Sequence, residues 1–206
     1  MKNYKTVKQP AEATYVVERS KFIAHVTSVE TREQAEAFIA KIKKEYWDAR
    51  HNVYAYALKG GETRCSDDGE PSGTSGMPTL DVILKQGFSD VCMVTTRYFG
   101  GILLGTGGLV RAYSKAAAMA LAEAGGVQVA ECEVYESVVP YALAEKFTRF
   151  LSDSGCVVEH TEYAVNVTVR YYMQAGERAL FLEKLTDRFH GEVQALLLKK
   201  DYKALE

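Results

Sequence analysis

A glycine-rich segment, GGILLGTGG at residues 100–108, constrains the fold more than any other part of this sequence. Five of its nine residues are glycine. The apolar run before it, residues 90–98, predicts a strand buried on both faces, and residues 106–124 carry apolar side chains at helical spacing. Glycine has no Cβ, so its amides can approach a ligand or another backbone, and the start of a helix presents free N–H groups. The segment therefore predicts a strand, a loop and a helix with a binding site at the loop.

Two arginines flank this loop and suggest an anion pocket. Arg97 ends the predicted strand and Arg111 lies in the early turns of the helix, so both guanidinium groups could join the loop amides around a negative charge. The predicted binding residues are Arg97, Gly100, Gly101, Gly105, Thr106, Gly107, Gly108 and Arg111. The alternative is that the glycines serve tight helix-strand packing and that the arginines pair with the acidic loop at 67–70. Neither the P-loop nor the dinucleotide-binding fingerprint is met.

A second loop, near residues 66–75, carries three carboxylates. Asp67, Asp68 and Glu70 surround Gly69 and could hold a hard cation or act as acid and base. Asp-Gly and Glu-Pro are also common turn sequences, and the spacing is not that of an EF-hand. The sequence therefore predicts a solvated turn and no metal or other cofactor, with Mg²⁺ entering only if the glycine loop binds a nucleotide.

The remaining pattern predicts an α+β protein of two domains, 1–132 and 133–206. In the first, a hairpin over residues 13–29 precedes a helix that begins at a capping box on Thr31, with Gln34 as its second member. In the second, strand and helix periods alternate in the order βαββαβ, which is typical of the ferredoxin-like fold. The expected elements of the second domain are a strand at 127–139, a helix at 141–153, strands at 156–163 and 164–173, a helix at 177–190 and a strand at 193–199.

Charge and cysteine content argue against a domain that binds nucleic acid through its overall charge and against a disulfide or zinc framework. The formal net charge is −2, and the second domain has 9 basic against 12 acidic residues. A nucleic-acid contact would therefore need a local basic patch. The four cysteines are far apart and predict reduced, mostly buried thiols. The chain has no signal-peptide pattern and no apolar run of membrane length, so a cytoplasmic location is expected.

Three segments carry a family resemblance: ERSKFIA at 18–24, SDDGEPSGT at 66–74, and TRYFGGILLGTGGLVRAY at 96–113. Together they resemble the IMPACT family, bacterial branch. The resemblance implies an N-terminal α/β domain similar to domain IV of elongation factor G and a C-terminal domain similar to its domain V. It also adds accessory signature positions to the loop residues, namely Glu18, Lys21, His51, Asp67, Asp68 and Glu70.

The resemblance implies a function linked to translation. Eukaryotic relatives regulate translation by competing for a ribosome-associated co-activator of an amino-acid-starvation kinase, a pathway that bacteria lack. We therefore expect a non-enzymatic regulator that binds RNA, the ribosome or a protein partner through the glycine and arginine surface. The alternative is an enzyme for a nucleotide or phosphorylated metabolite, because the same superfamily fold includes small-molecule kinases with a similar loop. Against that alternative, Thr106 is the loop's one hydroxyl, and no catalytic residue is assigned.

Overall fold

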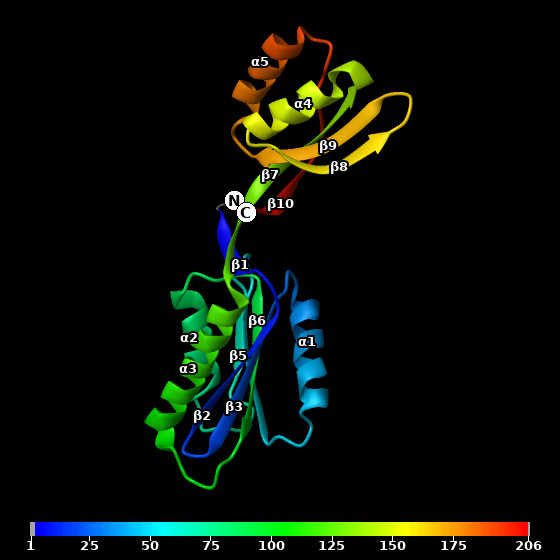
Figure 1. Ribbon diagram of the computed structural model, residues 1–206. Coiled ribbons are helices and arrows are strands. Elements are labelled where there is room, and N and C mark those ends of the chain that lie inside the picture. The colour runs from blue at the N-terminus through cyan, green and yellow to red at the C-terminus, as the bar shows by residue number, and fades with distance from the viewer. Residues whose placement is uncertain (1–2, 206) are drawn as a thin grey trace. The chain divides into compact units, whose positions relative to one another are not determined.

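The computed structural model describes residues 3–205, which form two compact units (Figure 1). The first unit spans Tyr4–Gln128 and the second Val129–Leu205. Strand β7 (Gly126–Val139) begins in the first unit and continues into the second. The boundary expected between residues 132 and 133 thus falls inside a strand, four residues beyond the division between the units. No helix in the described range is long and apolar enough to cross a membrane.

The first unit contains a five-stranded antiparallel sheet in the order β2-β3-β6-β4-β5. Its strands are β2 (Ala11–Val17), β3 (Ser20–Ser28), β6 (Val91–Tyr98), β4 (His51–Ala57) and β5 (Thr63–Ser66). The predicted hairpin is β2 and β3, and β6 is buried on both faces along all but its last residue, as its apolar run predicted. The sequence did not predict β5, because this four-residue, partly exposed edge strand has no alternating pattern.

Three helices cover the two faces of this sheet. In Figure 1, α1 (Arg32–Glu45) lies on one side, and α2 (Gly76–Lys85) and α3 (Gly105–Ala124) lie on the other. The Thr31 hydroxyl accepts the Gln34 N–H as predicted, whereas the Gln34 side chain accepts from Glu30 rather than from Thr31 itself. The larger core lies beneath α2 and α3, and a smaller one lies beneath α1.

Strand β1 (Tyr4–Val7) forms backbone hydrogen bonds with the first unit. The Lys5 carbonyl accepts from Ser89 N–H, and the Lys8 N–H just after the strand donates to the carbonyl of Gly125.

The second unit has the predicted βαββαβ order. After β7 come α4 (Tyr141–Asp153), β8 (Val157–Tyr163), β9 (Val167–Gln174), α5 (Arg178–Phe189) and β10 (Leu196–Leu205). The sheet order β10-β7-β9-β8 and the packing of both helices against one face confirm a ferredoxin-like α+β unit. Tyr171 is fully buried in this core and shares a hydrogen bond with Ser137.

Candidate functional site

The glycine loop joins β6 to α3 and is held against the β2–β3 turn. A Cβ on Gly100 would lie 2.0 Å from the carbonyl carbon of Arg19, and the Gly100 N–H donates to the Ser20 hydroxyl at 3.1 Å. Gly105, with φ of +68°, allows the chain to turn into the helix. The absence of a side chain at residue 100 therefore serves contact with another backbone segment. That segment is the β2–β3 turn, whereas the alternative predicted packing between a helix and a strand.

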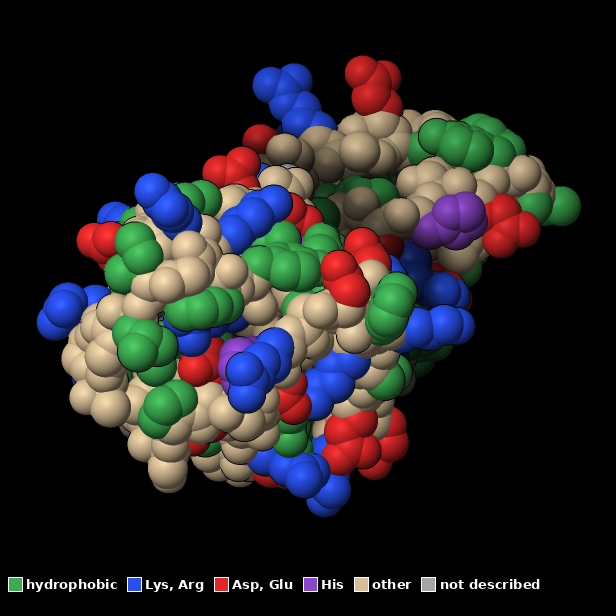
Figure 2. Space-filling view, turned by 90° about the horizontal axis from the view of Figure 1, so that it is seen from below, with side chains coloured by type: hydrophobic (Ala, Val, Ile, Leu, Met, Phe, Trp, Pro, Cys, Tyr) green, Lys and Arg blue, Asp and Glu red, His purple; other side chains and the backbone are tan. Residues whose placement is uncertain are grey.

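The loop exposes apolar side chains beside a hollow. Phe99, Ile102 and Leu103 are 57%, 40% and 87% exposed. The hollow has a volume of about 400 Å³ and is lined by Arg50, His51, Gly69, Glu70, Pro71, Arg97, Phe99, Leu103, Leu104, Gly105, Thr106 and Leu109. Figure 2 views the chain from the end at which this loop lies in Figure 1, and hydrophobic side chains project there among charged ones.

The arginine that faces this hollow is already neutralised. Arg97 is buried, and its Nη1 donates to both oxygens of Glu70, at 2.8 and 3.0 Å. The Tyr113 hydroxyl donates to the same carboxylate at 2.9 Å. The Arg97 guanidinium also lies 5.4 Å from the Phe22 ring centroid and 5.7 Å from that of Phe99. The charge of Arg97 is thus balanced within the fold by Glu70. For this arginine, the structure shows the pairing with the acidic loop that was the alternative to an anion pocket.

Tyr113 donates because it stays protonated. Burial raises the pKa of its hydroxyl, and the adjacent Glu70 carboxylate raises that pKa further. The hydroxyl therefore remains a hydrogen-bond donor across the physiological range.

The other two carboxylates of the acidic loop hold the backbone. Asp67 accepts N–H groups from Gly73, Ser75 and Gly76, which fixes the start of α2. Asp68 accepts from the Lys43 ammonium at 2.6 Å and from a backbone N–H of β4. Within residues 3–205, no group of three metal-ligating side chains is close enough to hold an ion. These carboxylates therefore shape the turn.

Two side chains from the start of β4 supply polarity to the hollow. His51 Nδ1 lies 2.9 Å from the Asp68 carbonyl, and since a carbonyl only accepts, Nδ1 carries a hydrogen. Arg50 is exposed at the rim, and none of the described carboxylates forms a salt bridge with it. Arg50 is thus the unpaired cation of the hollow.

The remaining predicted residues do not join this hollow. Arg111 lines a second depression together with Glu18 and Gly108, and Leu103 and Leu104 border both. Lys21 is exposed at the start of β3, opposite Tyr98 of β6. The structure therefore places Arg97 and Arg111 in different depressions, and they do not form the single anion pocket that the sequence predicted.

Sequence reasoning missed the apolar part of the hollow. Leu103, Leu104 and Leu109 contribute most of it, with Phe99 and Pro71. A signal was present, because Ile102-Leu103-Leu104 is an apolar run inside a glycine-rich loop, where no helical or strand period requires it.

The four cysteines are free. Cys92, Cys132 and Cys156 are buried as expected, whereas Cys65 is only partly buried. Burial raises the pKa of Cys92 to about 12, and burial together with Glu177 raises that of Cys156 to about 12. These thiols remain protonated at neutral pH.

Comparison with known proteins identifies the family. The Impact N-terminal domain matches residues 18–121, and a domain of unknown function, DUF1949, matches residues 138–192. IMPACT family member YvyE of Bacillus subtilis is 39% identical over 194 residues, which cover 92% of this chain and 88% of the relative. The chain belongs to the IMPACT family.

Other IMPACT relatives extend the likeness. IMPACT family member YigZ of Escherichia coli is 32% identical over 198 residues, covering 93% of this chain and 97% of YigZ. Mouse Protein IMPACT is 37% identical over 94 residues, which cover 42% of this chain and 29% of the mouse protein. A crystal structure described as that of a hypothetical protein superposes with a TM-score of 0.62 at 30% identity, covering 97% of this chain and 98% of the other.

Proposed function

We propose that this IMPACT-family protein is a non-enzymatic, translation-linked binding protein that docks a protein partner at the hollow beside the glycine loop. The link to translation comes from the family resemblance. The choice of a protein partner comes from the chemistry of the surface. RNA and the ribosome itself are the other partners that the family resemblance allows.

The exposed apolar loop is the observation that carries the proposal. Leu103 is 87% exposed next to a hollow of about 400 Å³, although the same loop is fixed to the fold through Gly100. Burying one leucine side chain stabilises a complex by about 1.5–3 kcal/mol. A fixed loop that displays such residues beside a hollow fits the apolar anchor of a partner.

The charges of the hollow favour a protein over a phosphate backbone at this place. Arg97 is balanced by Glu70, which leaves Arg50 as the cation available there. The N-terminus of α3 adds a partial positive charge, because Leu104 gives it no side-chain cap. One cation and one helix end suit a single carboxylate beside an apolar side chain, as on a protein surface, better than a row of phosphates.

A matched pair of substitutions tests this proposal. Leu103→Asp places a charge in the docking surface, whereas Leu84→Asp makes the same change on α2, where Leu84 is 48% exposed and away from the hollow. Partner retention would be measured by co-sedimentation with ribosomes and by pull-down with translation factors from the source cell. The proposal predicts that Leu103→Asp weakens retention about 10-fold or more, the equivalent of losing one buried leucine. Equal retention of both variants would contradict it.

A phosphorylated small molecule is the second candidate, favoured by the uncapped start of α3. Gly105 and Thr106 line the hollow at that helix end, where backbone N–H groups and a hydroxyl would contact a phosphate. Any Mg²⁺ would have to arrive with the ligand, since the nearby carboxylates already accept hydrogen bonds within the fold. Nucleotides and phosphorylated metabolites, with and without Mg²⁺, should then raise the melting temperature with ligand concentration. A flat response would exclude the ligands tested.

A further inference from the structure

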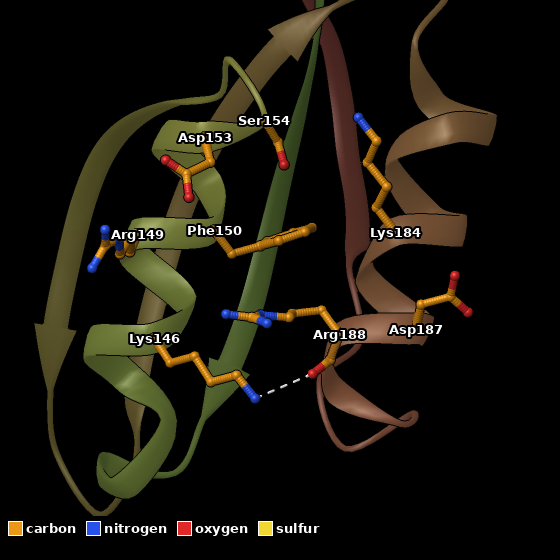
Figure 3. Close-up of a pocket in the computed structure, with 8 residues that line it drawn as sticks. All are labelled: Lys146, Arg149, Phe150, Asp153, Ser154, Lys184, Asp187 and Arg188. Atoms are coloured by element: carbon orange, nitrogen blue, oxygen red, sulfur yellow. Dashed lines mark hydrogen bonds between the residues drawn. The ribbon is translucent and has the colours of Figure 1, made fainter.

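A basic hollow lies between the two helices of the second unit, α4 and α5. It has a volume of about 660 Å³ and is lined by four cationic side chains: Lys146 and Arg149 of α4, and Lys184 and Arg188 of α5. Figure 3 shows Lys146, Lys184 and Arg188 extending into the space between the helices. The spacing explains this arrangement, because residues three or four apart lie on the same side of a helix.

These four cations have no ion-pair partner. None of them forms a salt bridge with any carboxylate in residues 3–205. Lys146 donates to the Arg188 carbonyl at 3.3 Å and lies 5.1 Å from the Phe189 ring centroid. Asp153 and Asp187 also border the hollow and reduce its net charge, but they leave it positive by two.

The hollow is basic although the domain as a whole is acidic. Residues 133–206 carry 9 basic and 12 acidic side chains, and four of the nine basic ones line this hollow. Packing does not require them there, since the helices are held to the sheet by buried Phe147, Leu151, Phe181 and Phe189. Four exposed like charges around one hollow repel one another, and this repulsion opposes the stabilisation that the Lys146 contacts provide.

We propose that this hollow binds the phosphate backbone of an RNA strand. A polyanion fits better than a single phosphate, because all four cations are exposed and each contact alone is weakened by water and salt. Several contacts at once release several counterions, which makes the sum favourable. The Arg188 guanidinium, which Figure 3 shows in the space between the helices, adds paired donors that match phosphate oxygens, and the half-buried Phe150 and Ser154 supply an apolar floor and a hydroxyl. This site supplies the local basic patch that an overall acidic domain needs.

The RNA site is independent of the partner surface proposed for the first unit. Its residues lie on α4 and α5, whereas the loop and hollow of the first unit lie on β4, β6 and α3. Loss of one activity therefore leaves the other measurable. Leu103→Asp is expected to retain RNA binding.

Fluorescence anisotropy with a labelled single-stranded RNA of about 20 nucleotides tests the site. The variant replaces Lys184 and Arg188 with glutamine, and the control makes the same change in net charge at Lys199 and Lys200 of β10. Removing two phosphate contacts should weaken binding about 10-fold or more at about 50 mM salt and reduce the slope of log affinity against log salt by about 1.4. The control should bind nearly as the wild type does, and unchanged melting temperatures would show that both variants are folded.

Four results would overturn the proposal. The first is a wild-type protein that does not bind RNA at low salt. The second is an equal loss of RNA binding in the variant and in the control. Displacement of the RNA by millimolar inorganic phosphate would identify a small-anion site instead. Displacement by polyglutamate at the same charge concentration would identify a site for an acidic protein.

Discussion

The pair formed by Glu70 and Arg97 gives the sharpest test of the candidate site, because a single substitution leaves Arg97 buried without its counter-charge. The side chains are 3% and 8% exposed, and Tyr113 donates to the same carboxylate. Glu70→Gln keeps the shape of the side chain but removes its charge. Breaking a buried pair in this way costs about 3–5 kcal/mol, because the remaining ion is left uncompensated. That is a large part of the roughly 5–15 kcal/mol that stabilises a typical domain.

The matched control is Glu36→Gln, in the same unit. Glu36 is 48% exposed and pairs with Arg32 at 2.8 Å and Arg64 at 3.2 Å, so water already screens its interactions. The expected loss there is about 0–1 kcal/mol. Urea unfolding followed by circular dichroism would measure both variants, and amide hydrogen exchange in β6 would assign the loss to the first unit.

A loss for Glu70→Gln as small as that for Glu36→Gln would refute the reasoning. It would mean that Arg97 is not held by Glu70 in solution, and Arg97 would again become available as a ligand for an anion. The expected large loss would instead establish that Arg97 holds the wall of the hollow in place. In that case, lost binding in an Arg97 variant reports unfolding of the site rather than a missing contact.

Two further predictions concern the glycine loop and the effect of pH. Gly100→Ala should destabilise by about 1–3 kcal/mol or more, because its Cβ would meet the Arg19 backbone. Gly107→Ala should be neutral or stabilising by up to about 1 kcal/mol, because its Cβ meets only the end of a flexible side chain at 3.5 Å. Equal losses of unfolding free energy for the two variants in urea would refute this distinction. Burial lowers the pKa of His25 below 6.5 despite the opposing effects of Glu12 and Glu45, so the unfolded chain binds the proton more readily and stability should fall as pH drops below about 6.5. His25→Gln should reduce the difference between the urea midpoints at about pH 7.5 and 5.5. An unchanged difference would show that His25 does not cause the loss of stability.

Local sequence patterns predicted most of the secondary structure and the fold of the second unit. The capping hydroxyl of Thr31, the doubly buried strand β6 and the helix at 141–153 each follow from short-range chemistry that the chain displays directly. Strand β5 was missed because an edge strand of four residues depends on its neighbour rather than on its own pattern.

The candidate site was only partly predictable. The sequence pointed to the loop that borders the hollow, but it could not show whether Arg97 faces a ligand or Glu70, because that depends on a fold contact across 27 residues. Nor could it show that Arg111 lies in a separate depression. The basic hollow on α4 and α5 was overlooked because its four cations are divided between two helices that meet only in the fold.

Site-specific photo-crosslinking at position 103 tests the central claim most directly. A crosslinking amino acid would replace Leu103 in one preparation and Leu84 in another, and both would be mixed with purified ribosomes and translation factors from the source cell. We expect a discrete adduct with one protein from position 103 and none from position 84. Equal adducts from both positions, no adduct from either, or an adduct of position 103 with RNA alone would contradict it.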